Sequence, residues 1–212
     1  MNAVIFDMDG VMFDTEAVCM LAWDYAGELM GVGKAGYMVL KTLGMKAEAA
    51  IKVIKEEFGN DFDAEKFKKT GSEFSYVYFE KHGVPEKPGL YPLLDYLKEK
   101  EYKLAVASST RSKSVHHHLK EKGIEKYFDA VICGDMVEKS KPEPDIYLKA
   151  CRALGESPHN CCAVEDSKNG LLSAHRAGCS VIMVPDLWQG EADTDAFLFA
   201  KCKSLNEIVD IL

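Results

Sequence analysis

The sequence predicts an α/β fold in which a doubly wound, Rossmann-like parallel sheet forms the core domain and an α-helical cap domain is inserted into it. Five short apolar runs rich in Val, Ile and Ala indicate buried strands. The apolarity of these runs is continuous and does not alternate, which is typical of parallel strands covered on both faces. Helical patterns separate the runs, and one long helical segment breaks this rhythm near the N-terminus.

The core elements follow one another in the order that βαβ units require. Strands are expected at residues 3–6, 104–107, 130–133, 161–164 and 181–184. Helices are expected at residues 90–100, 113–122, 145–154 and 169–177. Because neighbouring parallel strands need a crossover connection, usually a helix, this alternation assigns residues 1–14 and 84–212 to one core domain.

Residues 15–83 have a different pattern and are assigned to the cap. Leu, Ala, Met and Phe recur there at helical spacing, and no strand-like apolar run interrupts them. The aromatic residues of this segment are interpreted mainly as the packing of a helical bundle. Gly83-Val84-Pro85 is expected to form the hinge that returns the chain to the sheet.

Length, charge and composition argue against several classes of function. With 212 residues, of which 47% are hydrophobic, the chain can bury a full core. A net charge of −8 without a block of Lys or Arg argues against binding to nucleic acid or to an anionic membrane. No apolar run reaches membrane-spanning length and no secretory signal is recognised, so a cytoplasmic location is expected. A monomer is expected because no apolar association stripe is evident.

The cysteine and histidine residues give no metal signature. The seven cysteines are odd in number and lack C-x-x-C spacing, and Cys133, Cys161 and Cys162 lie within apolar runs. Buried reduced thiols are therefore predicted. The three consecutive histidines at positions 116–118 point about 100° apart on a helix, so a solvated face is predicted for them instead of a chelate.

Polar residues gather where the expected strands end. In an open parallel sheet, ligands bind outside the carboxyl ends of the strands. One acidic strand end alone is weak evidence, because Asp also begins turns and Ser and Asp cap helices. Here several strand ends converge on one rim, and a Pro-rich loop adds Lys141. The strand-end residues are Asp7, Asp9, Ser108, Ser109, Glu165 and Asp166.

This set of residues suits phosphoryl transfer. A phosphate ester is dianionic, so an attacking carboxylate meets repulsion unless cations neutralise the site. Asp7, Glu165 and Asp166 offer the hard oxygen ligands that Mg²⁺ prefers. Lys141 would be the second cation, while the Ser108 hydroxyl and nearby backbone N–H groups would hold the phosphate oxygens.

Four motifs carry a family resemblance. They are Phe6-Asp7-Met8-Asp9-Gly10-Val11 with Asp14-Thr15, Ala107-Ser108-Ser109, Lys141-Pro142-Glu143-Pro144-Asp145-Ile146-Tyr147, and Val164-Glu165-Asp166-Ser167 with Gly170. In this order they resemble the haloacid dehalogenase superfamily, close to its β-phosphoglucomutase-like and sugar-phosphatase branch. The resemblance spans almost the whole chain and implies a cap that closes over the site.

The resemblance implies roles for these residues. Asp7 is expected to be the nucleophile that forms an aspartyl-phosphate, and Asp9 the general acid and base. The metal ligands expected for Mg²⁺ are Asp7, Asp9 through its backbone carbonyl, Glu165 and Asp166. The phosphate-binding residues are expected to be Ser108, Ser109 and Lys141.

The predicted function is a phosphatase acting on a small phosphorylated metabolite such as a sugar phosphate. Thr15, Lys46 and Arg111 are candidate substrate-binding residues of the cap and rim, although Lys46 and Arg111 could equally be surface cations. Cys19 occupies the hinge position where β-phosphoglucomutase carries a histidine that couples cap closure to the general acid.

This departure at Cys19 favours hydrolysis, and a β-phosphoglucomutase-type mutase is the alternative. A phospho-receiver domain is a remote alternative, because receivers lack the D-x-D spacing after the first strand and a cap of this size. A dehalogenase of the same superfamily fits poorly, since it has no use for Asp9 or the metal-binding pair.

Overall fold

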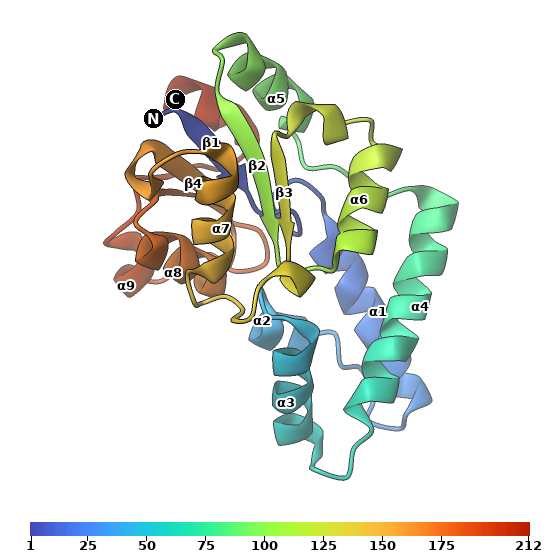
Figure 1. Ribbon diagram of the computed structural model, residues 1–212. Coiled ribbons are helices and arrows are strands. Elements are labelled where there is room, and N and C mark those ends of the chain that lie inside the picture. Colours follow the sequence, from blue (N-terminus) through green and yellow to red (C-terminus); the bar gives the residue numbers. More distant parts are fainter.

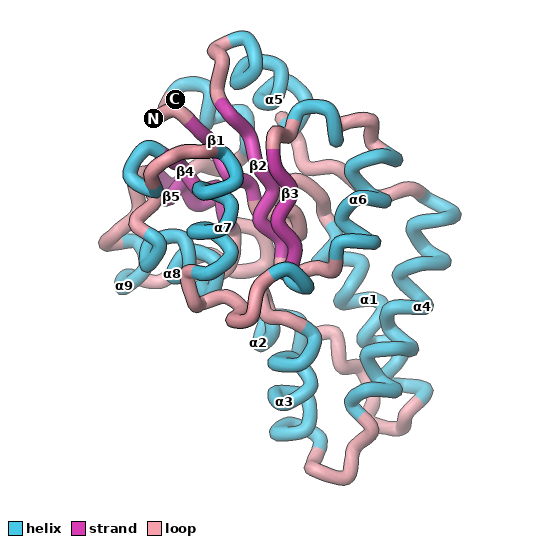
Figure 2. Tube along the Cα trace, in the orientation of Figure 1, coloured by secondary structure: helices cyan, strands magenta, loops and turns pink.

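The computed structural model describes residues 1–212 and contains a six-stranded parallel sheet (Figures 1 and 2). The strand order is β3-β2-β1-β4-β5-β6, so β1 lies at the centre and the order reverses beside it. Ile5 of β1 is in register with Ala105 of β2 and Ala163 of β4. The strands are β1 Ala3–Phe6, β2 Lys103–Ser108, β3 Ala130–Cys133, β4 Cys161–Glu165, β5 Ser180–Met183 and β6 Ala200–Lys201. The predicted fold class is therefore confirmed.

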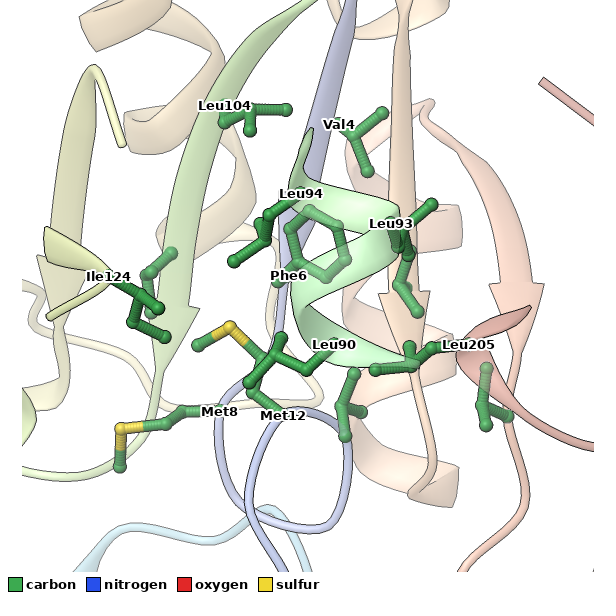
Figure 3. Packing of buried hydrophobic residues seen from close by; sticks show 14 of the residues in the cluster. Val4, Phe6, Met8, Met12, Leu90, Leu93, Leu94, Leu104, Ile124 and Leu205 are labelled. Atoms are coloured by element: carbon green, nitrogen blue, oxygen red, sulfur yellow. The ribbon is translucent and has the colours of Figure 1, made fainter. Parts of the chain in front are cut away.

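Helices cover both faces of this sheet, which explains why the strands are apolar apart from residues at their ends. On one face, α5 and α6 pack with β1 and β2 in a core of 24 buried residues; Figure 3 shows three leucines of α5 gathered near Phe6. On the other face, α7 and α8 belong to a core of 18 buried residues. These helices span α5 Leu90–Glu99, α6 Ser112–Glu121, α7 Asp145–Leu154 and α8 Lys168–Ala177, followed by the short α9 Ala192–Asp195. Four 3-10 turns complete the core, at Glu125–Tyr127, Gly134–Met136, Pro158–Asn160 and Leu205–Asp210.

Four further helices form the cap, which lies beyond the carboxyl ends of the strands (Figure 1). They are α1 Thr15–Leu29, α2 Met38–Thr42, α3 Ala47–Phe58 and α4 Ala64–His82. The cap has a hydrophobic core of its own, with 10 buried residues that include Trp23 and Phe67. Asp63 caps the start of α4 by accepting from the Lys66 N–H, and Gly83 follows its last turn. The domain limits given above, 1–14 with 84–212 and 15–83, stay a prediction.

The structure corrects some of the expected elements. Strand β6 has two residues, too few to produce an apolar run, and was not predicted. Strand β5 begins and ends one residue earlier than expected. Cys133, Cys161 and Cys162 are buried free thiols, as predicted.

The solvated face predicted for the three histidines is wrong for His118. Its side chain is only 8% exposed and packs edge-on against Phe13 and Phe79, because this side of α6 faces the joint between core and cap. His117 is exposed and His116 is partly exposed. The ligand atoms of His117, His118 and Glu121 lie within 4.8 Å of one another.

Two surface features bear on partners. No helix is both long and apolar enough to cross a bilayer. Leu21, Tyr25 and Leu29 are exposed on α1 at four-residue spacing, so an apolar stripe that the sequence analysis did not identify is present on the cap. The expected monomer therefore stays a prediction.

Candidate active site

The parallel register of β1 and β4 brings the acidic residues together. Phe6 is paired with Val164, so Asp7 leaves β1 beside Glu165, the last residue of β4. Asp166 follows at once. Asp7 is 6% exposed, Glu165 is fully buried and Asp166 is 1% exposed. Three carboxylates therefore meet at the carboxyl edge of the two central strands, where α/β sheets bind their ligands.

Lys141 supplies the positive charge of this cluster. It lies in the loop before α7, and its Nζ is 2.6 Å from Asp7 Oδ1 and 2.6 Å from Glu165 Oε1. The ammonium also donates to the Ala107 carbonyl at 3.0 Å and lies over the ring of Tyr147. Burial alone would lower the pKa of Lys141, but the carboxylates of Asp7 and Glu165 outweigh it and hold this pKa above its usual range.

Glu165 has both carboxylate oxygens engaged by the protein. Besides Lys141, its Oε1 accepts from the Tyr147 hydroxyl at 2.6 Å. Its Oε2 accepts from the Asp166 N–H and the Ser167 hydroxyl, each at 3.3 Å. A carboxylate with this many donors is fixed in place, so the contacts favour Glu165 as the residue that holds Lys141 beside Asp7.

Asp7 and Asp166 have the properties of a site for a hard divalent cation. The ligand atoms of Asp7, Glu165 and Asp166 lie within 4.8 Å of one another, and Asp166 Oδ2 is buried without a hydrogen-bond partner. Burial has the largest effect and raises the pKa of Asp7. The attraction of Lys141 lowers this pKa and the repulsion of Glu165 raises it, and the result is a pKa of about 8. Burial and the neighbouring carboxylates also raise the pKa of Asp166 well above its usual range. A cation beside such carboxylates stabilises their charged form, and oxygen donors fit Mg²⁺.

Gly10 makes room for this arrangement. Its φ is +81°, and a Cβ atom there would lie 2.2 Å from Asp166 Oδ2. Only glycine combines this backbone conformation with so close an approach. The turn after β1 can therefore pass directly over the Asp166 carboxylate.

Asp9 lies beside the cluster and is held by hydroxyl groups. Its Oδ1 accepts from Thr15 Oγ1 at 2.7 Å, and its Oδ2 accepts from Thr110 Oγ1 at 2.8 Å and Ser108 Oγ at 3.3 Å. Thr15 is the first residue of α1, so the cap contributes one of these donors. The Asp9 carboxylate is thus oriented by both domains, separately from the ion pair of Asp7 with Lys141.

The other predicted residues connect cap and core at the rim. Ser109 Oγ donates to the Gly44 carbonyl at 2.7 Å. Lys46 Nζ donates to the carbonyl of Val137 at 2.6 Å, and Arg111 is paired with Glu48 at 3.6 Å and is largely exposed. Neither Lys46 nor Arg111 lines the cavity described next, so the structure does not bring these two residues to the reacting groups.

A cavity of about 920 Å³ lies between the cap and the carboxyl edge of the sheet. Asp7, Asp9, Thr15 and Ser109 line it. Several further lining residues were not predicted as site residues, namely Glu16, Trp23, Lys68 and Thr110. Thr110 belongs to the polar strand end Ser108-Ser109-Thr110 that the sequence indicates, so a role for it could have been predicted. The cap residues could not, since at helical spacing they are indistinguishable from packing residues.

The fold and this site together define a capped α/β enzyme. A family model described as haloacid dehalogenase-like hydrolase matches residues 4–184. The chain belongs to the haloacid dehalogenase-like hydrolase family, as its motifs predicted.

Named relatives agree with this assignment. The phosphorylated carbohydrates phosphatase of Thermotoga maritima is 34% identical over 100% of this chain and 98% of the relative. Beta-phosphoglucomutase of Bacillus subtilis is 29% identical over 87% of this chain and 83% of the relative. The crystal structure of CbbY from Rhodobacter sphaeroides in complex with phosphate has a TM-score of 0.82 and 26% identity, covering 98% of this chain and 96% of that one. These findings support the prediction of a phosphoric monoester hydrolase.

Proposed function

We propose that this chain is a Mg²⁺-dependent phosphatase that hydrolyses a phosphorylated carbohydrate through an aspartyl-phosphate on Asp7. The observation that carries the proposal is the buried ion pair of Lys141 with Asp7, beside Asp166 and its unpartnered oxygen. A carboxylate that attacks a phosphate dianion needs neighbouring cations, and this site combines one ammonium with ligands for a second cation. The carbohydrate is inferred from the Thermotoga maritima relative.

Asp7 and Asp166 would hold the metal through their side chains, and the family resemblance adds the backbone carbonyl of Asp9. Bound Mg²⁺ would neutralise charge on the phosphoryl oxygens. Glu165, predicted as a further ligand, has contacts that suit it better to holding Lys141 in place. The ligand atoms of Glu165, Asp7 and Asp166 nevertheless lie within 4.8 Å of one another, so Glu165 is within reach of an ion bound by the other two residues.

In the first step, a carboxylate oxygen of Asp7 bonds to phosphorus as the bond from phosphorus to the sugar oxygen breaks. The Asp9 carboxyl group gives its proton to the departing oxygen. In the second step, Asp9 takes a proton from water, whose oxygen bonds to phosphorus while the bond to Asp7 breaks and phosphate leaves. The hydroxyls of Thr15, Ser108 and Thr110 fix the orientation of the Asp9 carboxyl group. The Lys141 ammonium stabilises charge in both steps.

The mutase remains the second candidate, because a beta-phosphoglucomutase is among the relatives. A mutase must protect its phosphoenzyme from water until a second sugar phosphate arrives. Cys19 lies in the cavity wall on α1, and burial, followed by the repulsion of Glu16, raises the pKa of its thiol far above neutrality. A neutral thiol cannot replace a histidine in a charge-dependent link to the general acid, which favours hydrolysis.

The experiment measures phosphate release from a panel of sugar phosphates with Mg²⁺ and with EDTA. Hydrolysis that requires Mg²⁺, with a phosphoenzyme trapped on wild type but not on Asp7→Asn, is the expected result. Asp61→Asn, an exposed cap residue, is the matched control and should retain activity. With a hexose 1-phosphate, formation of the 6-phosphate without free phosphate would establish the mutase instead. Full activity of Asp7→Asn would refute the covalent mechanism.

A further inference from the structure

Lys68 is a cation in the cap that faces the active-site cavity. It lies on α4, and its Nζ is 5.3 Å from the centre of the Trp23 ring on α1. Trp23 is itself buried, and both residues line the cavity that contains Asp7 and Asp9. The indole face holds an ammonium by cation–π attraction, so Lys68 has a defined position within the cavity wall.

This charge has no carboxylate partner in the protein. Lys41, Lys55 and Lys69 on neighbouring parts of the cap each have a carboxylate oxygen within 4.0 Å, whereas Lys68 has none and makes no hydrogen bond. Burial lowers the pKa of Lys68, and the more distant Cys19, Glu16 and Glu48 only partly oppose this. A partly buried ammonium without a counter-charge is unfavourable, so Lys68 lacks an anionic partner in the free protein.

The cavity is divided by charge. Its acidic lining residues are Asp7, Asp9 and Glu16, which lie at the end of the sheet and the first turn of α1. Its lysines are on helices α4 and α6, and of these Lys113 also lacks a carboxylate within 4.0 Å. A phosphoryl group bound beside Asp7 therefore leaves the rest of its substrate in a part of the cavity that favours negative charge.

We propose that Lys68 binds a second anionic group of the substrate, a carboxylate or a phosphate remote from the phosphoryl group that is transferred. This inference rests on the proposed phosphatase function and narrows its substrate class from phosphorylated carbohydrates to those with a second negative charge. Trp23 positions the ammonium, and the substrate anion provides its counter-charge. Charge-assisted pairing of this kind is stronger than a neutral hydrogen bond, so Lys68 selects such substrates.

The first test compares three probes that differ in the remote group: glucose 6-phosphate, 6-phosphogluconate and fructose 1,6-bisphosphate. Lys68→Met keeps an unbranched chain over Trp23 without the charge, and Lys68→Arg keeps the charge. Lys69→Met is the matched control, since Lys69 is next on the helix, is exposed and is paired with Glu73. The readout is the ratio of kcat/KM on each charged probe to kcat/KM on glucose 6-phosphate.

This ratio should fall about tenfold in Lys68→Met and be kept in Lys68→Arg and Lys69→Met. A fall confined to 6-phosphogluconate identifies a carboxylate as the remote group, and a fall confined to the bisphosphate identifies a phosphate. Equal losses on all three probes, or an unchanged ratio, would overturn the proposal. A ratio is used because it does not depend on the fraction of folded enzyme.

A second measurement separates this proposal from the phosphatase function. Calorimetry on Asp7→Asn, with and without Lys68→Met, gives the Kd of 6-phosphogluconate and of fructose 1,6-bisphosphate without turnover. The Kd of at least one probe should rise about tenfold when Lys68 is replaced. If wild type hydrolyses none of the probes, the proposed function fails while this binding result still decides the role of Lys68. Absence of binding, or Kd values that Lys68→Met does not change, would overturn it.

Discussion

Lys141 is the residue on which the buried charge of the site depends. Its ammonium contacts two carboxylates at 2.6 Å, and its side chain is fully buried. Removing one partner of a buried ion pair leaves the other charge without compensation, which costs more than the intact pair contributes. Lys141 is therefore expected to affect the stability of the core and, through Asp7, the reaction proposed above.

We expect Lys141→Met to lower the free energy of unfolding by about 3 kcal/mol, because Asp7 and Glu165 lose their shared cation. We also expect kcat to fall at least ~100-fold, since an electrostatic stabiliser of the transition state is lost. Urea unfolding and phosphate release measure the two effects. Lys139→Met, an exposed position in the same loop, should change neither. A stable, active Lys141→Met enzyme would contradict both expectations.

His118 predicts a change of stability with pH. Burial lowers its pKa below the usual 6.5, while Asp9 and Glu121 raise it and His117 lowers it further. The unfolded chain therefore binds the proton more readily than the folded chain. The stability that His118 contributes is present above pH 6.5 and is lost as pH falls through the lower, folded pKa.

Urea unfolding over the range of about pH 5 to 8 measures this loss, whose slope cannot exceed about 1.4 kcal/mol per pH unit for one proton. His118→Phe should have a smaller decline on the acid side than wild type, since the difference between the two proteins removes the titration of all other groups. His117→Phe, at the exposed neighbouring position, should decline like wild type. Identical slopes for wild type and His118→Phe would show that His118 titrates normally.

At the scale of elements, the ends of strands β1 and β4 and the start of α8 form the centre of the site. Ser167 caps α8 by accepting from the Gly170 N–H at 3.1 Å, so this helix begins directly against Glu165. A Cβ atom at Gly170 would lie 2.0 Å from the Glu165 carboxyl carbon. The first turn of α8 therefore has no space for a side chain at this position.

Gly170→Ala should destabilise the protein despite the better helix propensity of alanine. Alanine gains about 1 kcal/mol in a helix, but overpacking of a rigid buried group costs about 1–3 kcal/mol. The displaced Glu165 should also release Lys141, so kcat should fall together with stability. Thermal unfolding and phosphate release test this. Gly71→Ala, in the middle of α4, is the comparison: its Cβ would lie 3.1 Å from the Trp23 ring and 3.7 Å from the Ala22 carbonyl oxygen, and should cost much less.

The core elements could be predicted because each physical rule acts locally. Continuous apolar runs identify buried strands, and the end of a run locates a polar residue such as Asp7 or Asp166 at the ligand-binding edge. The same rule fails for β6, whose two residues are too short to form a run. The burial of His118 could not be predicted either, because it depends on Phe13 and Phe79, which are distant in the sequence and pack against it.

At the scale of the whole molecule, the segment of the cap between α2 and α3 is joined to the core by hydrogen bonds to backbone carbonyls. Ser109 donates to the Gly44 carbonyl, and Asn169 donates to the Leu43 carbonyl at 2.8 Å. Lys46 reaches from the cap to the carbonyls of Val137 and Glu138. The structure therefore shows the cap held against the sheet domain.

Lys46→Met should weaken this closed arrangement without touching the reacting groups. The loss of one such interaction is worth about 0.5–1.5 kcal/mol, so KM should rise about threefold to tenfold with little change in kcat. Steady-state kinetics at several substrate concentrations separate the two constants. Lys52→Met, an exposed cap lysine without an ion pair, should behave like wild type. A fall in kcat at constant KM would instead indicate that Lys46 stabilises the transition state.

The position of Lys68 beside Trp23 could not be predicted from the sequence, for a physical reason. Lys68 and Trp23 are far apart along the chain and meet only because α1 and α4 pack side by side, so no local pattern marks them. The strand-end residues, by contrast, are brought together by the sheet itself. Sequence reasoning therefore identifies the chemistry of this enzyme more readily than the molecule on which it acts.

The 10-residue hydrophobic core of the cap is distinct from the two cores that cover the sheet. Changes among the cap helices can therefore be absorbed within the cap, while the strands that support Asp7 keep their positions. Such a chain can evolve towards a new substrate without first giving up its reaction, and an engineer could exchange the insertion to the same end if Thr15, which holds Asp9, is kept.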